Sequence, residues 1–156
     1  RGLGDVYKRQ SLGFSDALNP YEETPAELAC VLKGGALIAE RTPFERVITN
    51  IQDGCVMGYK YFDFGADYGS KTMQLFADVM GFGCACDVHV RLDAEDGEEI
   101  GCFHVGRGAE CIKTRVKAVT GRHALYFAVT THYSGWTGDF FAGRCLMEFK
   151  KFVFMK

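Results

Sequence analysis

The sequence predicts an all-β protein, a two-layer β-sandwich of antiparallel strands with jelly-roll connections. Short runs rich in β-branched and aromatic residues recur along the chain, and turn signals separate them roughly every eight to twelve residues. No stretch of about twelve residues keeps the 3.6-residue period of an amphipathic helix. The 156 residues suit one domain, which buries about two thirds of its unfolded surface in a single core.

The composition excludes two classes of partner. Hydrophobic residues make up 47% of the chain and charged residues 24%, as in ordinary globular proteins. The formal charge of −2 provides no basic surface for nucleic acid or for an anionic membrane. No apolar run approaches the roughly 20 residues of a membrane span, and no segment has the pattern of an export signal. We expect neither nucleic acid nor a membrane as a partner.

The first twenty residues are expected to lie outside the domain. Residues 1–10, RGLGDVYKRQ, resemble the translated adaptor found at the ends of assembled environmental sequences. We therefore expect a non-native scar on a fragment of a longer protein, such as a metagenomic fragment. Residues 11–20 contain several turn-forming residues and predict a linker. The predicted domain spans residues 21–156.

Short strands are predicted along the whole domain. Before residue 84 the predicted strands are residues 26–32, 35–40, 46–52, 55–64 and 71–80. After residue 105 they are residues 111–116, 124–131 and 146–154. Residues 137–144 alone favour a short helical turn, and the chain contains no internal repeat.

Residues 84–105 predict the β-hairpin around which the other strands are arranged. In its first strand alternation places Cys84, Cys86, Val88 and Val90 on one face, opposite Ala85, Asp87, His89 and Arg91. In its second strand it places Ile100 and Cys102, followed by His104, opposite Gly101, Phe103 and Val105. The acidic connection, residues 93–97, ends in a glycine and is typical of an exposed turn.

Seven cysteines favour reduced thiols over a disulfide framework. They stand at positions 30, 55, 84, 86, 102, 111 and 145, and an odd number cannot be fully paired. Most lie in predicted strands, where cysteine behaves as a small core hydrophobe. Reduced thiols favour a cytoplasmic or anaerobic setting, although the compartment, cytoplasmic or secreted, stays open. Zinc at Cys84 and Cys86 is the alternative, but no second ligand pair accompanies them.

Catalytic motifs are missing from the sequence. Most acids fall in predicted turns, and the strand acids Asp63, Asp78, Asp87 and Glu148 either face water or serve a site. No nucleophile motif occurs, and no glycine-rich phosphate loop opens a helix after a strand. The four histidines, His89, His104, His123 and His132, lack the spacing of a metal pair. We expect no enzyme in this chain itself.

A loop between the last two predicted strands is the best binding candidate. Residues 132–141, HYSGWTGDFF, contain the only tryptophan of the chain. Aromatic planes stack on the C–H faces of sugar rings, so Trp136 and Tyr133 are the predicted platform. The predicted polar contacts are His132, Asp139 and, on the following strand, Glu148. In the alternative, Trp136 plugs the end of the sandwich beside Phe140 and Phe141, and both interpretations stay open.

Four groups of motifs add a resemblance. They are Asn-Pro-Tyr-Glu at 19–22 with Ala26-Glu27, Ile-Gln-Asp-Gly at 51–54 with residues 59–65, Val-Arg-Leu-Asp at 90–93 with Ile100-Gly101, and Val-Thr-Gly-Arg-His-Ala-Leu-Tyr-Phe at 119–127. In this order they resemble family 6 carbohydrate-binding modules, of the kind appended to family 43 glycoside hydrolases. The resemblance extends from residue 19 to residue 154.

The resemblance implies a galactose-binding-domain-like jelly roll. Such a module binds plant or other polysaccharides or oligosaccharides through end loops, has no chemistry of its own, and is covalently linked to a catalytic domain, here expected upstream. Two departures leave an alternative open, in which the domain is a structural accessory of a hydrolase and has lost sugar binding. Val56 replaces an aromatic residue of the family, and residues 108–111 lack its tryptophan.

The resemblance also implies a structural calcium ion, which the sequence disfavours. Lys150 stands where the family has an aspartate ligand, and Pro25 stands where it has a glutamate. Of the expected oxygen ligands, only Glu27 is carried over. We therefore expect no cofactor, and our hypothesis is an ion pair between Glu27 and Lys150 in place of the metal.

Overall fold

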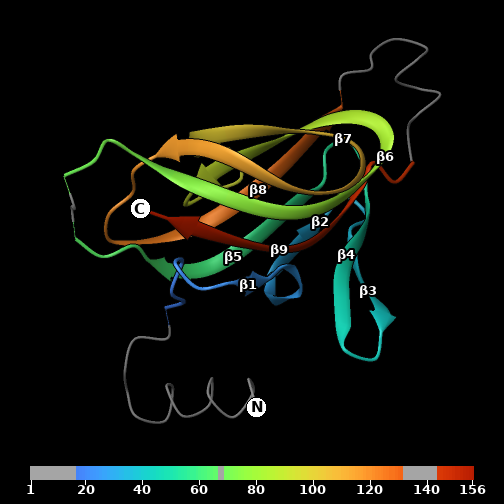
Figure 1. Cartoon of the computed structure of the whole chain (residues 1–156), viewed down its shortest axis with the longest axis horizontal. Helices are drawn as coiled ribbons and strands as arrows, with labels where there is room; N and C mark the ends of the chain where they lie inside the picture. Colours follow the sequence, from blue (N-terminus) through green and yellow to red (C-terminus); the bar gives the residue numbers. More distant parts are fainter. Residues whose placement is uncertain (1–16, 67–68, 132–143) are drawn as a thin grey trace.

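The structure is a computed structural model that describes residues 17–66, 69–131 and 144–156, and it is a sandwich of antiparallel strands (Figure 1). The elements in chain order are β1 (Thr24–Pro25), the 3-10 turn η1 (Ala26–Leu28), β2 (Val31–Lys33), β3 (Leu37–Thr42), β4 (Glu45–Ile51), β5 (Val56–Asp63), β6 (Thr72–Leu92), β7 (Glu98–Lys117), β8 (Arg122–Thr131) and β9 (Met147–Met155). The predicted fold class is confirmed. The described part of the chain contains no helix with the length and hydrophobicity needed to span a bilayer.

Two long strands cross from one layer of the sandwich to the other. The first half of β6 pairs with β9, its second half pairs with β8, and β7 follows β6 along almost its whole length. One layer therefore has the order β2, β5, β8, β6, β7, and the other has the order β3, β4, β9, β6, β7. Strand β1 joins the second layer beside β9.

The predicted strand at residues 71–80 is continuous with the first strand of the hairpin predicted at residues 84–105, and the second strand of that hairpin is continuous with the predicted strand at residues 111–116, so these predicted ends are wrong. Glycines mark a bend, called the crease here, in these two continuous strands. Gly83 and Gly108 take φ angles of 90° and 92°, which disfavour any residue with a side chain. A Cβ atom on Gly81 would lie 2.2 Å from the carbonyl oxygen of Gly106, so the two strands touch through their backbones at the crease.

An aromatic cluster fills the space between the two layers. Phe152 lies 5.0 Å from both Tyr59 and Phe127 and 5.6 Å from Phe149, measured between ring centroids. All four side chains are at most 1% exposed. The Tyr59 hydroxyl donates a hydrogen bond of 2.7 Å to the carbonyl oxygen of Ala26, and burial raises the pKa of Tyr59 well above its usual value. This contact fastens η1 to the core.

The predicted strand at residues 26–32 is only partly correct. Residues 26–28 form η1 instead, and the strand begins at Val31. Pro25 precedes η1 with a φ of −61°, which suits the entry to a helical turn. Residues 18–20 of the predicted linker lie against the sandwich, since Leu18 pairs with Phe62 and the Pro20 carbonyl accepts the Phe154 amide.

The alternation predicted for the central hairpin holds in its first strand and fails in its second. Cys86, Val88 and Val90 are fully buried, as predicted. On β7, Ile100 is an extra residue between the pairs Arg91–Glu99 and Val90–Gly101. This β-bulge shifts the period, so Phe103 and Val105 join Ile100 in the core while Cys102 and His104 are exposed.

The exposure of the cysteines also differs from the prediction. Cys30, Cys102 and Cys111 are exposed, Cys145 is half-buried, and Cys55 and Cys86 belong to the core. All six are free thiols. The prediction of core thiols is therefore wrong for the three exposed cysteines.

Candidate functional site

One end of the sandwich gathers the backbone that surrounds the predicted binding loop. Strand β8 ends at Thr131, whose amide donates a 2.9 Å hydrogen bond to the carboxylate of Asp53 in the turn between β4 and β5. The amide of Leu146, just before β9, donates to the carbonyl of Ile51 at 2.7 Å. The two anchor points of residues 132–145 therefore lie at the ends of β4 and β8. We call this part of the molecule the β8–β9 end.

Four predicted site residues lie outside the described residues. They are His132, Tyr133, Trp136 and Asp139, all within residues 132–143. The predicted helical turn at residues 137–144 also falls there except for Arg144. Their roles stay predictions, as does the alternative in which Trp136 packs beside Phe140 and Phe141.

Glu148, the fifth predicted contact, is buried in a polar network. It is 8% exposed on β9. One carboxylate oxygen accepts a 3.1 Å hydrogen bond from Nε of Arg41, and the other accepts a 2.6 Å bond from the hydroxyl of Thr49. The Arg41 guanidinium is also in ion-pair contact with this carboxylate. Glu148 therefore orients Arg41, whose side chain remains 44% exposed.

An exposed aromatic side chain at the same end was missed from the sequence. Phe82 lies in the crease of β6 and is 46% exposed. Its amide bonds to the carbonyl of Leu146, close to the point where the binding loop rejoins the sandwich. Across the ladder it pairs with Arg107, whose guanidinium lies against Gly83. The sequence signal for the exposure of Phe82 is its position between Gly81 and Gly83, because glycines inside a strand mark a bend.

The two positions at which the family carries aromatic residues have other surroundings here. Val56 lies on the outer face of β5 and packs with Val31, Ala124 and Tyr126 in a small apolar cluster. Residues 108–111 are part of β7 and pair with residues 78–81 of β6. Neither position supplies a sugar-stacking ring.

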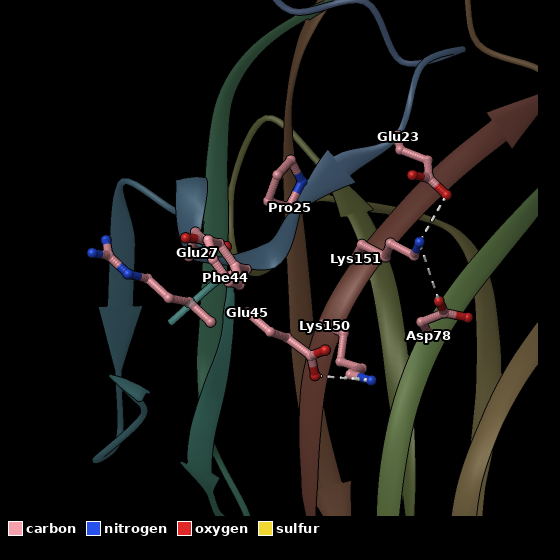
Figure 2. A pocket seen from close by; sticks show the side chains of 9 residues that line it. Glu23, Pro25, Glu27, Phe44, Glu45, Asp78, Lys150 and Lys151 are labelled. Atoms are coloured by element: carbon pink, nitrogen blue, oxygen red, sulfur yellow. Dashed lines mark ion pairs between the residues drawn. The ribbon is translucent and has the colours of Figure 1, made fainter. Parts of the chain in front are cut away.

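A second candidate site is a charged cavity beside β9, seen in Figure 2. Its volume is about 340 Å³. Its lining consists of Glu23, Pro25, Glu27, Phe44, Glu45, Arg46, Asp78, Lys150 and Lys151. The cavity contains the positions that the family resemblance assigned to calcium, Pro25, Glu27 and Lys150.

Ion pairs line this charged cavity, but the predicted pair between Glu27 and Lys150 is not among them. Nζ of Lys150 lies 3.0 Å from Oε1 of Glu45 (Figure 2). Nζ of Lys151 lies 3.0 Å from Oε2 of Glu23 and 3.8 Å from Oδ2 of Asp78. The hypothesis of a Glu27–Lys150 pair is therefore wrong, because β4 places Glu45 beside Lys150.

The remaining acids and histidines form dispersed surface pairs. His89 contacts Glu99 at 2.8 Å, His104 contacts Asp87 at 3.2 Å, and His123 contacts Asp93 at 2.9 Å. Asp63 caps the amide of Gly65 at 2.9 Å. Across the described ranges, no three His, Cys, Asp or Glu side chains are placed to hold a metal ion. These groups carry no recognisable catalytic arrangement.

Comparison with known proteins shows which solved structures share this fold. Neither a protein-family model nor a curated protein matches the sequence. Among solved structures, a family 6 carbohydrate-binding module from Clostridium cellulolyticum, in complex with xylose, matches with a TM-score of 0.70 and 19% identity, over 89% of this chain and 100% of that one. A module from Clostridium stercorarium in complex with cellobiose matches with a TM-score of 0.68 and 18% identity, over 90% of this chain and 97% of that one.

A larger protein contains a similar domain. The glycoside hydrolase family 43 arabinoxylan arabinofuranohydrolase from Bacillus subtilis, in complex with cellotetraose, matches with a TM-score of 0.72 and 27% identity over 90% of this chain. This chain spans 28% of the length of that hydrolase. The class defined by the fold is a carbohydrate-binding-module-like β-sandwich. More narrowly, the chain has the fold of family 6 carbohydrate-binding modules, as its motifs indicated.

Proposed function

We propose that this chain is a non-catalytic carbohydrate-binding module that contacts a polysaccharide through loops at the β8–β9 end. The observation that carries the proposal is the match over about nine tenths of the chain to modules described in complex with xylose and cellobiose. The turn at Asp53 borders the β8–β9 end, and binding residues concentrate on connections held by a rigid scaffold, which supports the proposal.

In the proposed site, aromatic side chains stack on the sugar and polar side chains form hydrogen bonds with it. Trp136 and Tyr133 stack on the apolar faces of sugar rings, and His132 and Asp139 bond to hydroxyl groups. Phe82 extends the aromatic surface from the crease of β6. Glu148 acts through Arg41, because its carboxylate holds the guanidinium and leaves further N–H donors for a ligand.

The proposal includes a covalently linked catalytic domain upstream. The match to part of an arabinofuranohydrolase supports this arrangement, since the similar domain there is a minor share of a longer chain. In such a protein the module holds the enzyme near its polymer, which raises the effective concentration of substrate without adding chemistry.

The direct test is retention of the whole chain in native gels that contain polysaccharides, after a glycan array has selected the ligand. Replacing Trp136 with Ala is expected to weaken binding by about 1–3 kcal/mol, or roughly 5- to 150-fold, because one stacked ring is lost. Phe44→Ala is the matched control, an aromatic that is 98% exposed at the opposite end of β4. Unchanged binding by the Trp136 variant would contradict the assigned platform.

A second candidate function is a structural accessory domain without sugar binding. It is favoured by the apolar surroundings of Val56 and by the strand that replaces the aromatic loop at residues 108–111. The same gels separate the two candidates, because a structural domain migrates equally with and without every polysaccharide on the array.

A further inference from the structure

The charged cavity owes its two lysines to an irregularity in β9. Asp78 of β6 pairs with Lys151, but the next residue, Val79, pairs with Phe149. Lys150 is thus an extra residue in β9, a β-bulge. Without it, alternation places neighbouring residues on opposite faces. With it, Lys150 and Lys151 both line the cavity while Phe149 and Phe152 both stay in the core.

The two ammonium groups join four segments of the second layer. Lys151 bonds to Glu23, which precedes β1, and lies near Asp78 of β6. Lys150 bonds to Glu45 at the start of β4. The three acidic partners and the two lysines of β9 all line the same cavity (Figure 2). Lys151 thereby links the segment before β1 to β6, and Lys150 links β9 to β4.

The donor set does not fit a calcium ion. Calcium takes six to eight oxygen ligands at about 2.3–2.6 Å, several of them carboxylates. The cavity holds four carboxylates, but three of them, Glu23, Glu45 and Asp78, already face ammonium groups within 4 Å. Glu27 is the one carboxylate of the lining outside these pairs. With Arg46 and the two lysines, the lining has a formal charge of only −1, which gives a dication little attraction.

We propose that Lys150 and Lys151 replace a structural divalent cation, so that this chain closes the β1–β9 junction without metal. The ammonium groups supply the positive charge that the carboxylates require, and the bulge at Lys150 supplies the second of them. The proposal rests on the charged cavity and on the calcium positions that the family resemblance implies, and it is independent of sugar binding.

The first test compares thermal unfolding of the whole chain in excess chelator and in millimolar calcium, followed by circular dichroism. The midpoint is expected to be the same in both solutions, and calorimetric titration with calcium is expected to show no saturable heat. A rise of the midpoint in calcium, or saturable calcium binding, would overturn the proposal.

The second test restores an acid in the bulge. Lys150→Asp gives the lining a formal charge of −3 and places a fifth carboxylate beside Glu27 and Glu45. This variant is expected to unfold at a lower temperature in chelator and to gain about 5 °C or more in calcium, through binding to the folded state.

The matched control for that test is Lys71→Asp, an exposed lysine outside the cavity lining that undergoes the same change of charge. Its midpoint is expected to be equal in the two solutions. If the Lys150 variant also showed equal midpoints, the ammonium group would not be what excludes the cation, and the proposal would fail. Should that variant not fold, the titration of the unsubstituted chain still decides.

Discussion

Strand β9 has one face in the core and the other in the charged cavity, and different interactions stabilise the two faces. Inward, Phe149 and Phe152 stack with an interplanar angle of 21° and contact rings from β5 and β8. Outward, Lys150 and Lys151 are each more than 40% exposed, and they contact their partners, Glu45 for Lys150 and Glu23 and Asp78 for Lys151, through ion pairs. Loss of a buried ring leaves its neighbours without packing contacts and costs much stability. Loss of an exposed charge costs little, because water screens its ion pair.

This difference explains how the fold of family 6 modules persists here while family site residues are replaced. The aromatic core keeps the layers in register. The outer residues at positions 56, 108–111 and 150 change without disturbing it, because they contribute little to packing between the layers. We therefore expect the fold and the proposed binding site to be separable, and each is open to a separate experiment.

The largest effect on stability is expected from the core. Phe152→Ala removes a ring that contacts Tyr59, Phe127 and Phe149, and it leaves a cavity in a close-packed interior. We expect a loss of about 3–5 kcal/mol in the free energy of unfolding, measured with urea. Phe44→Ala, with its ring 98% exposed, is expected to change that free energy by less than about 0.5 kcal/mol. Equal effects of the two substitutions would refute the contrast.

A smaller effect is expected where the core meets η1. Tyr59→Phe keeps the ring and removes only the hydroxyl that donates to Ala26. The Ala26 carbonyl still accepts the amide of Ala29 at 3.2 Å, so the expected loss is about 1 kcal/mol. Tyr61→Phe, at a side chain that is 43% exposed, serves as the control and is expected to be near neutral. Urea unfolding of the pair measures the difference, and a neutral Tyr59 variant would show that this bond does not fasten η1.

The smallest effect is expected from the cavity. Hydrogen bonding to Glu23 raises the pKa of Lys151 above its ordinary value of 10.5. A raised pKa in the folded state means that the pair stabilises the protein below pH 10.5, and this contribution is lost as the pH rises through the higher folded pKa. Because the groups are exposed, Lys151→Met is expected to cost less than about 1 kcal/mol.

Thermal unfolding of the Lys151 variant and the unsubstituted chain over a pH series measures this linkage. The two midpoints are expected to differ at about pH 9 and to converge above pH 10.5. A difference that grows with alkaline pH would contradict the assigned pair.

The sequence was sufficient to predict the fold class, because the two-residue alternation of apolar side chains indicates which face of a strand is buried. The alternation of residues 86–91 corresponds to a strand with the predicted inward face, and the predicted strand at residues 55–64 corresponds to β5. The motif order added the family likeness, which the matched structures bear out. These signals are local, so a single sequence carries them.

What the sequence did not reveal depends on irregular pairing between distant strands. A bulge at Ile100 reversed the faces assigned to Cys102 and Phe103, and a bulge at Lys150 brought Glu45 in place of Glu27 to its ammonium group. The run Phe-Lys-Lys-Phe at 149–152 does break the alternation, and this was the available signal for the second bulge. The exposure of Phe82 likewise follows from the crease, where continuous strands bend.

The separation of fold from binding site is tested most directly by measuring the affinity of three proteins for the oligosaccharide that a glycan array selects. Isothermal titration of the unsubstituted chain, Trp136→Ala and Lys151→Met is expected to show binding that weakens at least about fivefold in the tryptophan variant. The lysine variant is expected to stay within about twofold of the unsubstituted chain, since its cavity lies apart from the β8–β9 end. Equal affinity of all three proteins, or no binding by any of them to the whole array, would contradict the account.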